Sequence, residues 1–121
     1  MACLRLTLIE PAPGNEQEAQ RVMETLDGCL AGSPGLILSF VTEVETSRMG
    51  RISLWHSKDD ANHVALRDDI LALRSQLRRL SVTTQETLMD LKSGHVPEQL
   101  AAQLAGDLDI EPIATTMGAV A

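Results

Sequence analysis

Apolar and polar residues alternate at the start of the chain. Leu4, Leu6 and Leu8 fall on one face at a period of two, which predicts a β-strand over residues 3–9. The prolines and the glycine at positions 11–14 interrupt any regular structure and end this strand.

The next stretch changes to a helical period. Apolar residues over 15–30 recur three and four positions apart and polar residues take the opposite face, which predicts an amphipathic helix. Asn15 and Glu18 have the spacing of a capping box at its start. The sequence Gly-Ser-Pro-Gly over 32–35 ends the helix.

Two strands follow, joined by a predicted hairpin loop over 46–50 in which Gly50 would take a positive φ. The strand over 36–45 carries apolar residues on both faces in its first half, and 51–56 forms the return strand. A strand with one wet face would alternate cleanly, so both faces of this one are expected to be covered.

The remainder of the module is a broken helix and a last strand. Ser57 is expected to cap the helix, and the paired aspartates at 68–69 look like a second helix start, so a break is predicted near residue 68. The Thr- and Val-rich stretch 81–91 reads as the fourth strand, and Ser93 with the following glycine closes the module.

The predicted order is β-α-β-β-α-β, the ferredoxin-like α+β fold with a four-stranded antiparallel sheet. Residues 1–94 form this domain, and 95–121 form an extension or tail with one short helix over 97–105. The helices cover one sheet face, and the other would be an exposed apolar patch. Two sheets packed face to face by a two-fold axis would bury it, which predicts a homodimer of the dimeric α+β barrel type.

Charge and composition narrow the partners. The 121 residues suit one domain, and the net charge of −7 disfavours duplex nucleic acid and anionic membrane surfaces. No apolar run approaches the roughly 20 residues that span a bilayer. Cys3 and Cys29 form no metal-binding pattern with the scattered histidines and are interpreted as small buried hydrophobes, so no metal and a cytoplasmic location are expected. No phosphate-binding glycine loop or catalytic triad order appears.

Three landmarks together carry a resemblance to a known family: Pro13 with Gly14 after the first strand, Pro34 with Gly35 after the first helix, and a Trp-x-Ser-x-acid turn from Trp55 into a helix. Over about residues 4–94 the chain resembles the antibiotic biosynthesis monooxygenase domains. That family includes cofactor-independent monooxygenases acting on polycyclic aromatic phenols, and haem-degrading enzymes.

The resemblance implies a pocket between the helices and the sheet in each subunit, lined by Trp55, with His63 on the adjacent helix. Family members use pocket asparagines; here the first strand has none, and Thr7 is the nearest equivalent. The chain also lacks tyrosine as a phenolic acid.

Several residues are candidates for a binding site. If Trp55 faces the helices, strand alternation places Ser53 and Arg51 on the same face, where they would supply polar groups to an apolar pocket. Trp55 would stack on a flat ligand, or would instead seal the core.

His63 would act as a general base or an axial haem ligand, or would be a partly buried structural histidine. Arg67, one helical turn further on, is a candidate substrate contact. Arg5 lies in an apolar strand and must be paired, with Glu10, Glu43 or Glu86, or must reach an anionic ligand.

The function expected from the sequence is a homodimer that binds a small hydrophobic or aromatic molecule, with cofactor-independent oxygenation of a phenol as the reaction if it is an enzyme. No cofactor is expected. A non-catalytic binding or interaction module is the first alternative, and haem binding or degradation is the second. A cavity beside Trp55 below about 100 Å³, well under the few hundred of ordinary ligand sites, would argue against catalysis.

Overall fold

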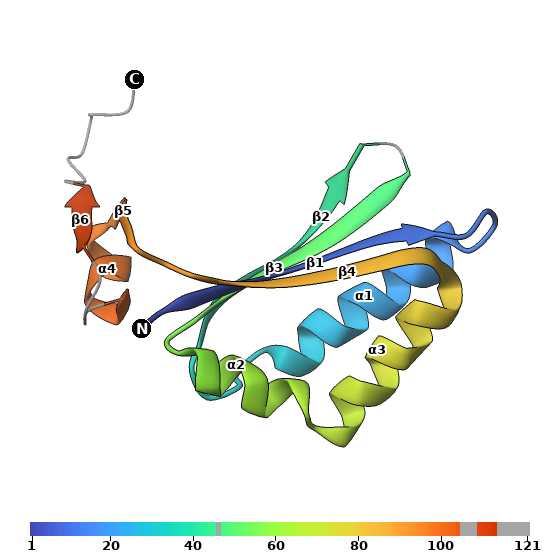
Figure 1. The fold of residues 1–121 in the computed structure, drawn as a ribbon, viewed down its shortest axis with the longest axis horizontal. Coiled ribbons are helices and arrows are strands. Elements are labelled where there is room, and N and C mark those ends of the chain that lie inside the picture. Colours follow the sequence, from blue (N-terminus) through green and yellow to red (C-terminus); the bar gives the residue numbers. More distant parts are fainter. Residues whose placement is uncertain (46, 105–108, 114–121) are drawn as a thin grey trace.

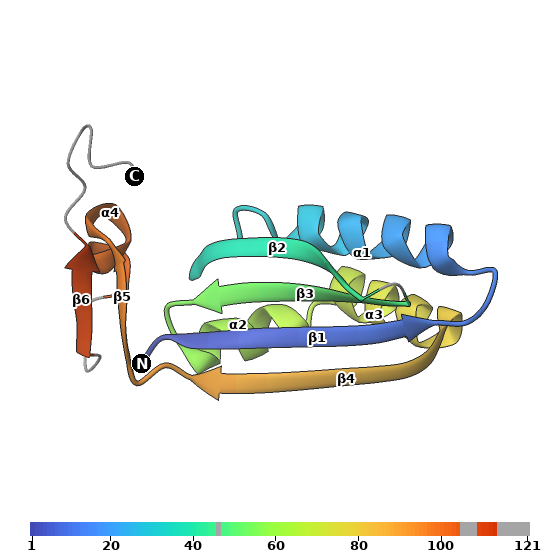
Figure 2. The ribbon, with the colours of Figure 1, turned by 90° about the horizontal axis from the view of Figure 1, so that it is seen from above.

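The fold is an antiparallel sheet with helices on one face. The structure is a computed structural model that describes residues 1–45, 47–104 and 109–113. Its main sheet has the strand order β2-β3-β1-β4, and helices α1, α2 and α3 cover one side (Figures 1 and 2). Within the module the elements are β1 (Cys3–Pro11), α1 (Glu16–Leu30), β2 (Leu36–Val44), β3 (Arg48–Trp55), α2 (Lys58–Ala65), α3 (Asp68–Leu80) and β4 (Ser81–Asp90). The predicted βαββαβ fold and the break between α2 and α3 are confirmed.

The core lies between the helices and the sheet. Buried apolar side chains of α1, such as Val22, Met23 and Leu26, pack on Ile9 and on the buried residues of α2 and α3. Cys3 is a buried free thiol in this core, and Cys29 is a half-buried free thiol packed against it. Aliphatic burial of this kind is the main stabilising term in a chain with so few aromatic side chains.

Two details of the turns differ from the sequence predictions. Gly50 does not lie in a hairpin loop at positive φ, because β3 begins at Arg48 and pairs Gly50 with Leu8 on one side and Thr42 on the other. The positive φ falls instead on Glu45, at 60°. The return strand begins three residues earlier than the apolar pattern indicated, and the turn is correspondingly shorter.

Of the two helix caps predicted from the sequence, one is confirmed and the other is wrong. Ser57 caps α2 as predicted, since its hydroxyl accepts a hydrogen bond from the Asp60 amide at 3.1 Å. Asn15 makes no side-chain cap for α1, and its Nδ2 donates to the carbonyl of Leu80 at 3.3 Å. The asparagine thus joins the start of α1 to the end of α3, a tertiary partner that a local capping rule does not anticipate.

The C-terminal extension adds β5 (Ser93–Pro97), α4 (Glu98–Ala101), a 3-10 turn (Ala102–Leu104) and β6 (Asp109–Ile113), with β5 and β6 parallel. The helix predicted over 97–105 corresponds to α4 and the 3-10 turn, and position 94 lies inside β5. Leu104 is buried against Ala2 and Leu54, at the end of the sheet where β1 begins. The part of the tail beyond residue 113 lies outside the described residues.

The pairing register fixes which side chains occupy the face away from the helices. Leu6 stands between Ile52 and Thr87, and Phe40 continues this row on β2. A second row consists of Leu38, Leu54, Leu4 and Met89. Phe40 is 57% exposed and Met89 39% exposed, so the helix-free face is apolar and partly uncovered in the single chain. No helix of the described residues is long and apolar enough to cross a membrane.

Gly35 is the turn position where the fold demands glycine. It has φ +86°, and a Cβ placed there would lie 2.4 Å from Oδ2 of Asp60 and 2.6 Å from its Cβ. Gly32 has φ +79° in the same connection, but a Cβ there would meet nothing within 4 Å. The pair therefore separates backbone strain from steric overlap.

We expect Gly35→Ala to lower the free energy of unfolding by about 2–4 kcal/mol, since strain and overlap with Asp60 add. Gly32→Ala is the matched control and should cost about 1–2 kcal/mol, from strain alone. Urea denaturation followed by circular dichroism measures both. Equal losses for the two variants would contradict the role assigned to the close approach of Asp60.

Candidate functional site

Polar residues interrupt the helix-covered face of the sheet in two adjacent rows. One row runs Arg51, Thr7, Glu86 across β3, β1 and β4, and the next runs Ser53, Arg5, Leu88. Directly paired side chains on one face lie about 5 Å apart at Cβ, so these rows form a compact polar patch. The patch faces the apolar side chains of the helices.

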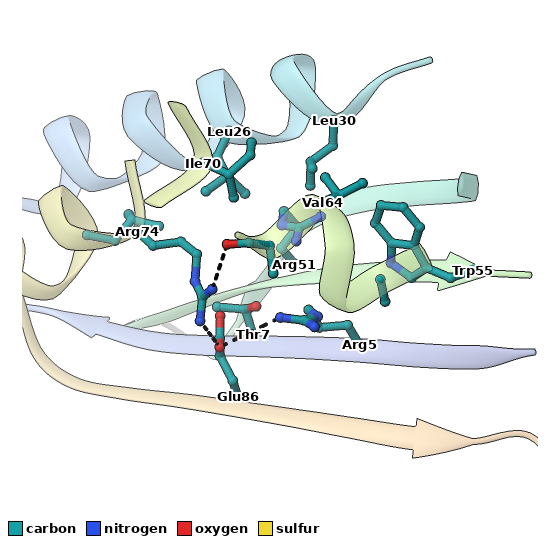
Figure 3. A pocket seen from close by; sticks show the side chains of 13 residues that line it. Arg5, Thr7, Leu26, Leu30, Arg51, Trp55, Val64, Ile70, Arg74 and Glu86 are labelled. Atoms are coloured by element: carbon teal, nitrogen blue, oxygen red, sulfur yellow. Dashed lines mark hydrogen bonds and ion pairs between the residues drawn. The ribbon is translucent and has the colours of Figure 1, made fainter. Parts of the chain in front are cut away.

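A cavity separates this patch from the helices. Its volume is about 20 Å³, room for about one water molecule. Figure 3 shows Trp55 at one end, Arg5 and Arg51 beside Thr7, and Arg74 with Glu86 toward the other end. The lining consists of Arg5, Thr7, Leu26, Leu30, Arg51, Trp55, Ala61, Val64, Ala65, Ile70, Arg74, Leu77 and Glu86.

A second cavity of about 130 Å³ lies next to the first, between α3 and β4. The two share four lining residues: Thr7, Arg74, Leu77 and Glu86. We call them the inner and the outer cavity. The Arg74–Glu86 ion pair contributes to the walls of both and holds α3 against the edge strand β4 (Figure 3).

Arg5 is anchored from two directions. Its Nη2 donates to Oδ1 of Asn62 on α2 at 3.1 Å, and its Nη1 lies 3.9 Å from Oε2 of Glu86. Its Nε has no hydrogen-bond partner. Burial lowers the pKa of Arg5, an effect that the nearby Glu86 carboxylate partly offsets. Of the acids proposed as partners from the sequence, the structure brings Glu86 to Arg5.

Arg51 is the most buried charge, with 4% of its surface exposed. Its nearest acidic neighbour is Asp27 on α1, with 3.8 Å between Nη1 and Oδ1, and neither of these atoms makes a hydrogen bond. The Nε of Arg51 also lacks a partner. Burial lowers the pKa of Arg51 to about 10, which leaves the guanidinium charged at neutral pH. Such a group costs stability unless something else at the site compensates it.

Trp55 is 1% exposed, and its Nε1 donates to the hydroxyl of the fully buried Ser53 at 2.9 Å. This bond satisfies the indole N–H and leaves the ring to line the inner cavity. Thr7, which is 8% exposed, lines the same cavity from β1. The structure therefore places Trp55 and Ser53 on the helix-covered face, as strand alternation predicted, although Ser53 itself lines neither cavity.

His63 and Arg67 lie elsewhere. His63 is on the exposed side of α2 and lines neither cavity. Arg67 follows the end of α2, so the shared helical face does not exist. Its guanidinium pairs with Asp69 at 2.6 Å and donates to Ser33 at 3.3 Å, which fastens the break between α2 and α3 onto the turn after α1.

Sequence reasoning missed two contributors, Asn62 and Arg74. Asn62 positions Arg5, and Arg74 completes the wall through Glu86. An available signal was the presence of arginines inside the two central, otherwise apolar strands, because such charges need partners from the covering helices.

No family model matches the chain, and no curated protein matches it in sequence. SnoaB, a cofactor-independent oxygenase from Streptomyces nogalater, has a TM-score of 0.67 at 17% identity, over 75% of this chain and 93% of SnoaB. A Caulobacter crescentus protein provisionally named an antibiotic biosynthesis monooxygenase has a TM-score of 0.67 at 17% identity, over 74% of this chain and 88% of its own.

The chain has the antibiotic biosynthesis monooxygenase fold. Rv0793 from Mycobacterium tuberculosis is also similar, with a TM-score of 0.69 at 10% identity, over 74% of this chain and 94% of that protein. At such identities the likeness establishes the fold alone. The chemistry that the cavity of this chain supports depends on the residues that line it.

The cost of burying Arg51 can be measured as a change in the free energy of unfolding. We expect Arg51→Met to leave the free energy of unfolding unchanged or to raise it by up to about 2 kcal/mol, because an apolar side chain replaces a poorly paired buried charge. Chemical denaturation measures this. Arg48→Met is the matched control, since Arg48 lies on the same strand but is partly exposed and paired with Glu45 at 2.8 Å; its effect should stay within about 0.5 kcal/mol. A loss above about 1 kcal/mol for Arg51→Met would instead make the Asp27 pair a structural brace.

Proposed function

We propose that the protein is a homodimer in which each subunit binds one compact aromatic molecule between the sheet and the helices. The observation that carries this is the placement of Trp55, a fully buried indole that lines a cavity instead of being packed on all sides. Aromatic rings bind well against such a face.

The two sides of the inner cavity would orient the ligand. Apolar side chains from the helices, including Leu26, Val64 and Ile70, form one side, and the polar patch around Thr7 and Arg51 forms the other. Ligand sites commonly combine a mostly apolar lining with a few placed polar groups. A ring carrying one polar substituent would match this division.

The inner cavity of this structure is too small for such a ligand. The volume of the inner cavity is about 20 Å³. This is below the limit of about 100 Å³ under which a cavity beside Trp55 argues against catalysis. Binding therefore requires the inner and outer cavities to join, and only the side chains of Thr7, Arg74, Leu77 and Glu86 belong to both. For this reason we propose binding first and a reaction second.

The homodimer is supported by the helix-free face of the sheet. Its strand residues form apolar rows around Leu6, Ile52 and Phe40, and the paired rows of the four strands carry charges on this face only at Glu10 and Arg48, at one end of the sheet. In a chain of net charge −7, an almost uncharged face is where two copies meet with least repulsion. A second copy, packed sheet to sheet, is the occupant that we propose.

The second candidate is a cofactor-independent oxygenase, because SnoaB is described as one and shares the fold. A phenol bound near Arg5 and Arg51 would lose its proton more readily, since nearby positive charge favours the phenolate. The electron-rich anion would then react with dioxygen. Oxygen uptake with a hydroxynaphthoquinone-type substrate, lost in Arg51→Met, would support this reaction. Loss in His63→Ala would separately support the role predicted for His63.

Haem binding and a non-catalytic interaction module are the two remaining alternatives, and different experimental results would support them. Haem binding would require His63 to face a haem-sized space, whereas its side chain lies outside both cavities. A Soret band on haem titration that disappears in His63→Ala would favour it. A non-catalytic interaction module would be indicated if no small aromatic molecule binds.

Ligand binding can be followed by Trp55, which is the only tryptophan of a chain without tyrosine. We expect para-cresol, a neutral phenol, to change the Trp55 fluorescence saturably, with a Kd in the micromolar to millimolar range. Ala61→Leu should abolish the change by filling the inner cavity, which Ala61 lines. Ala31→Leu, at an exposed position after α1, is the control. The absence of a saturable change in the wild-type protein would refute the proposed ligand.

Dimer formation is tested at Phe40, on the helix-free face. We expect the wild-type protein to sediment as a dimer at micromolar concentration, and Phe40→Lys to weaken the dimer about 100-fold or more, as loss of a central aromatic contact does. Leu71→Lys places the same charge on the helix layer, at a side chain 41% exposed, and should leave the dimer intact. A monomeric wild-type protein, or equal dissociation of the two variants, would contradict this arrangement.

A further inference from the structure

Two buried guanidinium groups line one very small cavity. Arg5 is 9% exposed and Arg51 is 4% exposed, and they stand on paired strands, with Arg5 opposite Ser53 and Arg51 opposite Thr7. Like charges this close repel, and this repulsion contributes, with burial, to lowering the pKa of Arg51. A fold under no other demand would place apolar residues at these two positions.

The local charges do not balance. Three guanidinium groups, those of Arg5, Arg51 and Arg74, line the inner cavity, and the only carboxylate in its lining is Glu86. Asp27 faces Arg51 from α1 at 3.8 Å without a hydrogen bond. Even when Asp27 is included, the site carries one excess positive charge, although the whole chain is acidic.

Hydrogen-bond donors are also left over. Nε of Arg5 and both Nε and Nη1 of Arg51 are buried and have no partner among the described residues. Unsatisfied buried donors are uncommon and costly, and those of a charged group are best satisfied by an anion. A single water molecule would accept some of these bonds but would not neutralise the charge.

Resting on the proposed function, the arrangement of donors and charge points to a ligand class: we infer that the natural ligand is a compact aromatic or apolar molecule bearing one carboxylate or comparable single negative charge, bound by Arg51 and Arg5 with its ring toward Trp55. The planar fork of a guanidinium matches the two oxygens of a carboxylate. One such charge completes the balance of the site. The apolar helix side of the cavity excludes a larger or multiply charged group such as a nucleotide.

In this arrangement Arg5 and Arg51 are the residues that determine specificity for the anion. Arg5 keeps its hydrogen bond to Asn62 while its Nε turns to the ligand, and Arg51 supplies the second donor from the neighbouring strand. Glu86 is hydrogen-bonded to Arg74 and lies 3.9 Å from Nη1 of Arg5, so it leaves Nε of Arg5 without a partner. The anion therefore occupies donors that no protein group uses.

The test compares benzoate with benzamide, which have the same shape but differ in charge. Both are titrated against full-length wild-type protein, with Trp55 fluorescence and calorimetry as readouts. We expect benzoate to bind about tenfold or more tightly than benzamide, because a buried charge-assisted hydrogen bond favours the anion. Arg51→Met should remove this preference while retaining benzamide binding. Arg48→Met, which removes the same charge from the same strand at a partly exposed position, should keep the preference.

The possible results of these titrations distinguish the anionic ligand from the aromatic site. Equal affinities for benzoate and benzamide would overturn the anionic ligand but leave the aromatic site in place. No binding of benzoate, benzamide or para-cresol would overturn both. A benzoate preference that survives in Arg51→Met would place the anion elsewhere and overturn the inference. If Arg51→Met fails to fold, Arg5→Gln and Arg51→Lys replace it: the first should reduce the preference and the second should keep only part of it, since lysine lacks the guanidinium fork.

Discussion

The antiparallel register between β1 and β3 determines which side chains face the helices and which lie on the open face of the sheet. Pairing Thr7 with Arg51 and Arg5 with Ser53 turns four polar side chains toward the helices, and pairing Leu6 with Ile52 turns the leucines of β1 the other way. A slip of one residue would exchange the two faces. The buried arginines, the cavity and the apolar outer face are thus consequences of one alignment of two central strands.

Much of this was accessible from the sequence because the period of the apolar residues identifies strands and helices, although it did not show that Arg5 and Thr7 occupy the more buried face of β1. The alternation of Leu4, Leu6 and Leu8 gave the first strand, and the paired aspartates at 68–69 marked the break after α2. The conformation of Gly50 and the side-chain partner of Asn15 were mispredicted for a common reason. Glycine often occupies hairpin turns and asparagine often caps helices. Here a partner distant in sequence decides instead: Gly50 pairs with Leu8, and the side chain of Asn15 donates to the carbonyl of Leu80.

The candidate site was predictable only in part. Strand alternation from Trp55 correctly placed Ser53 and Arg51 beside the helices, because a period of two needs no tertiary information. The role of Asn62 depends on how α2 is rotated over β1, and that of Arg74 on how close α3 lies to the edge strand, neither of which a local pattern encodes. His63 was singled out by resemblance to a family motif, and the exposed side of α2 is where the fold places it.

The break between α2 and α3 gives the site two independent fastenings. Asn62 on α2 holds Arg5 over the middle of the sheet, while Arg74 on α3 holds Glu86 on the outermost strand. The two helices are separate segments joined at Leu66 and Arg67, so the helix that positions Arg5 is not the helix that pairs with β4. A displacement of α3 from β4 would therefore widen the outer cavity and leave the hydrogen bond between Asn62 and Arg5 in place.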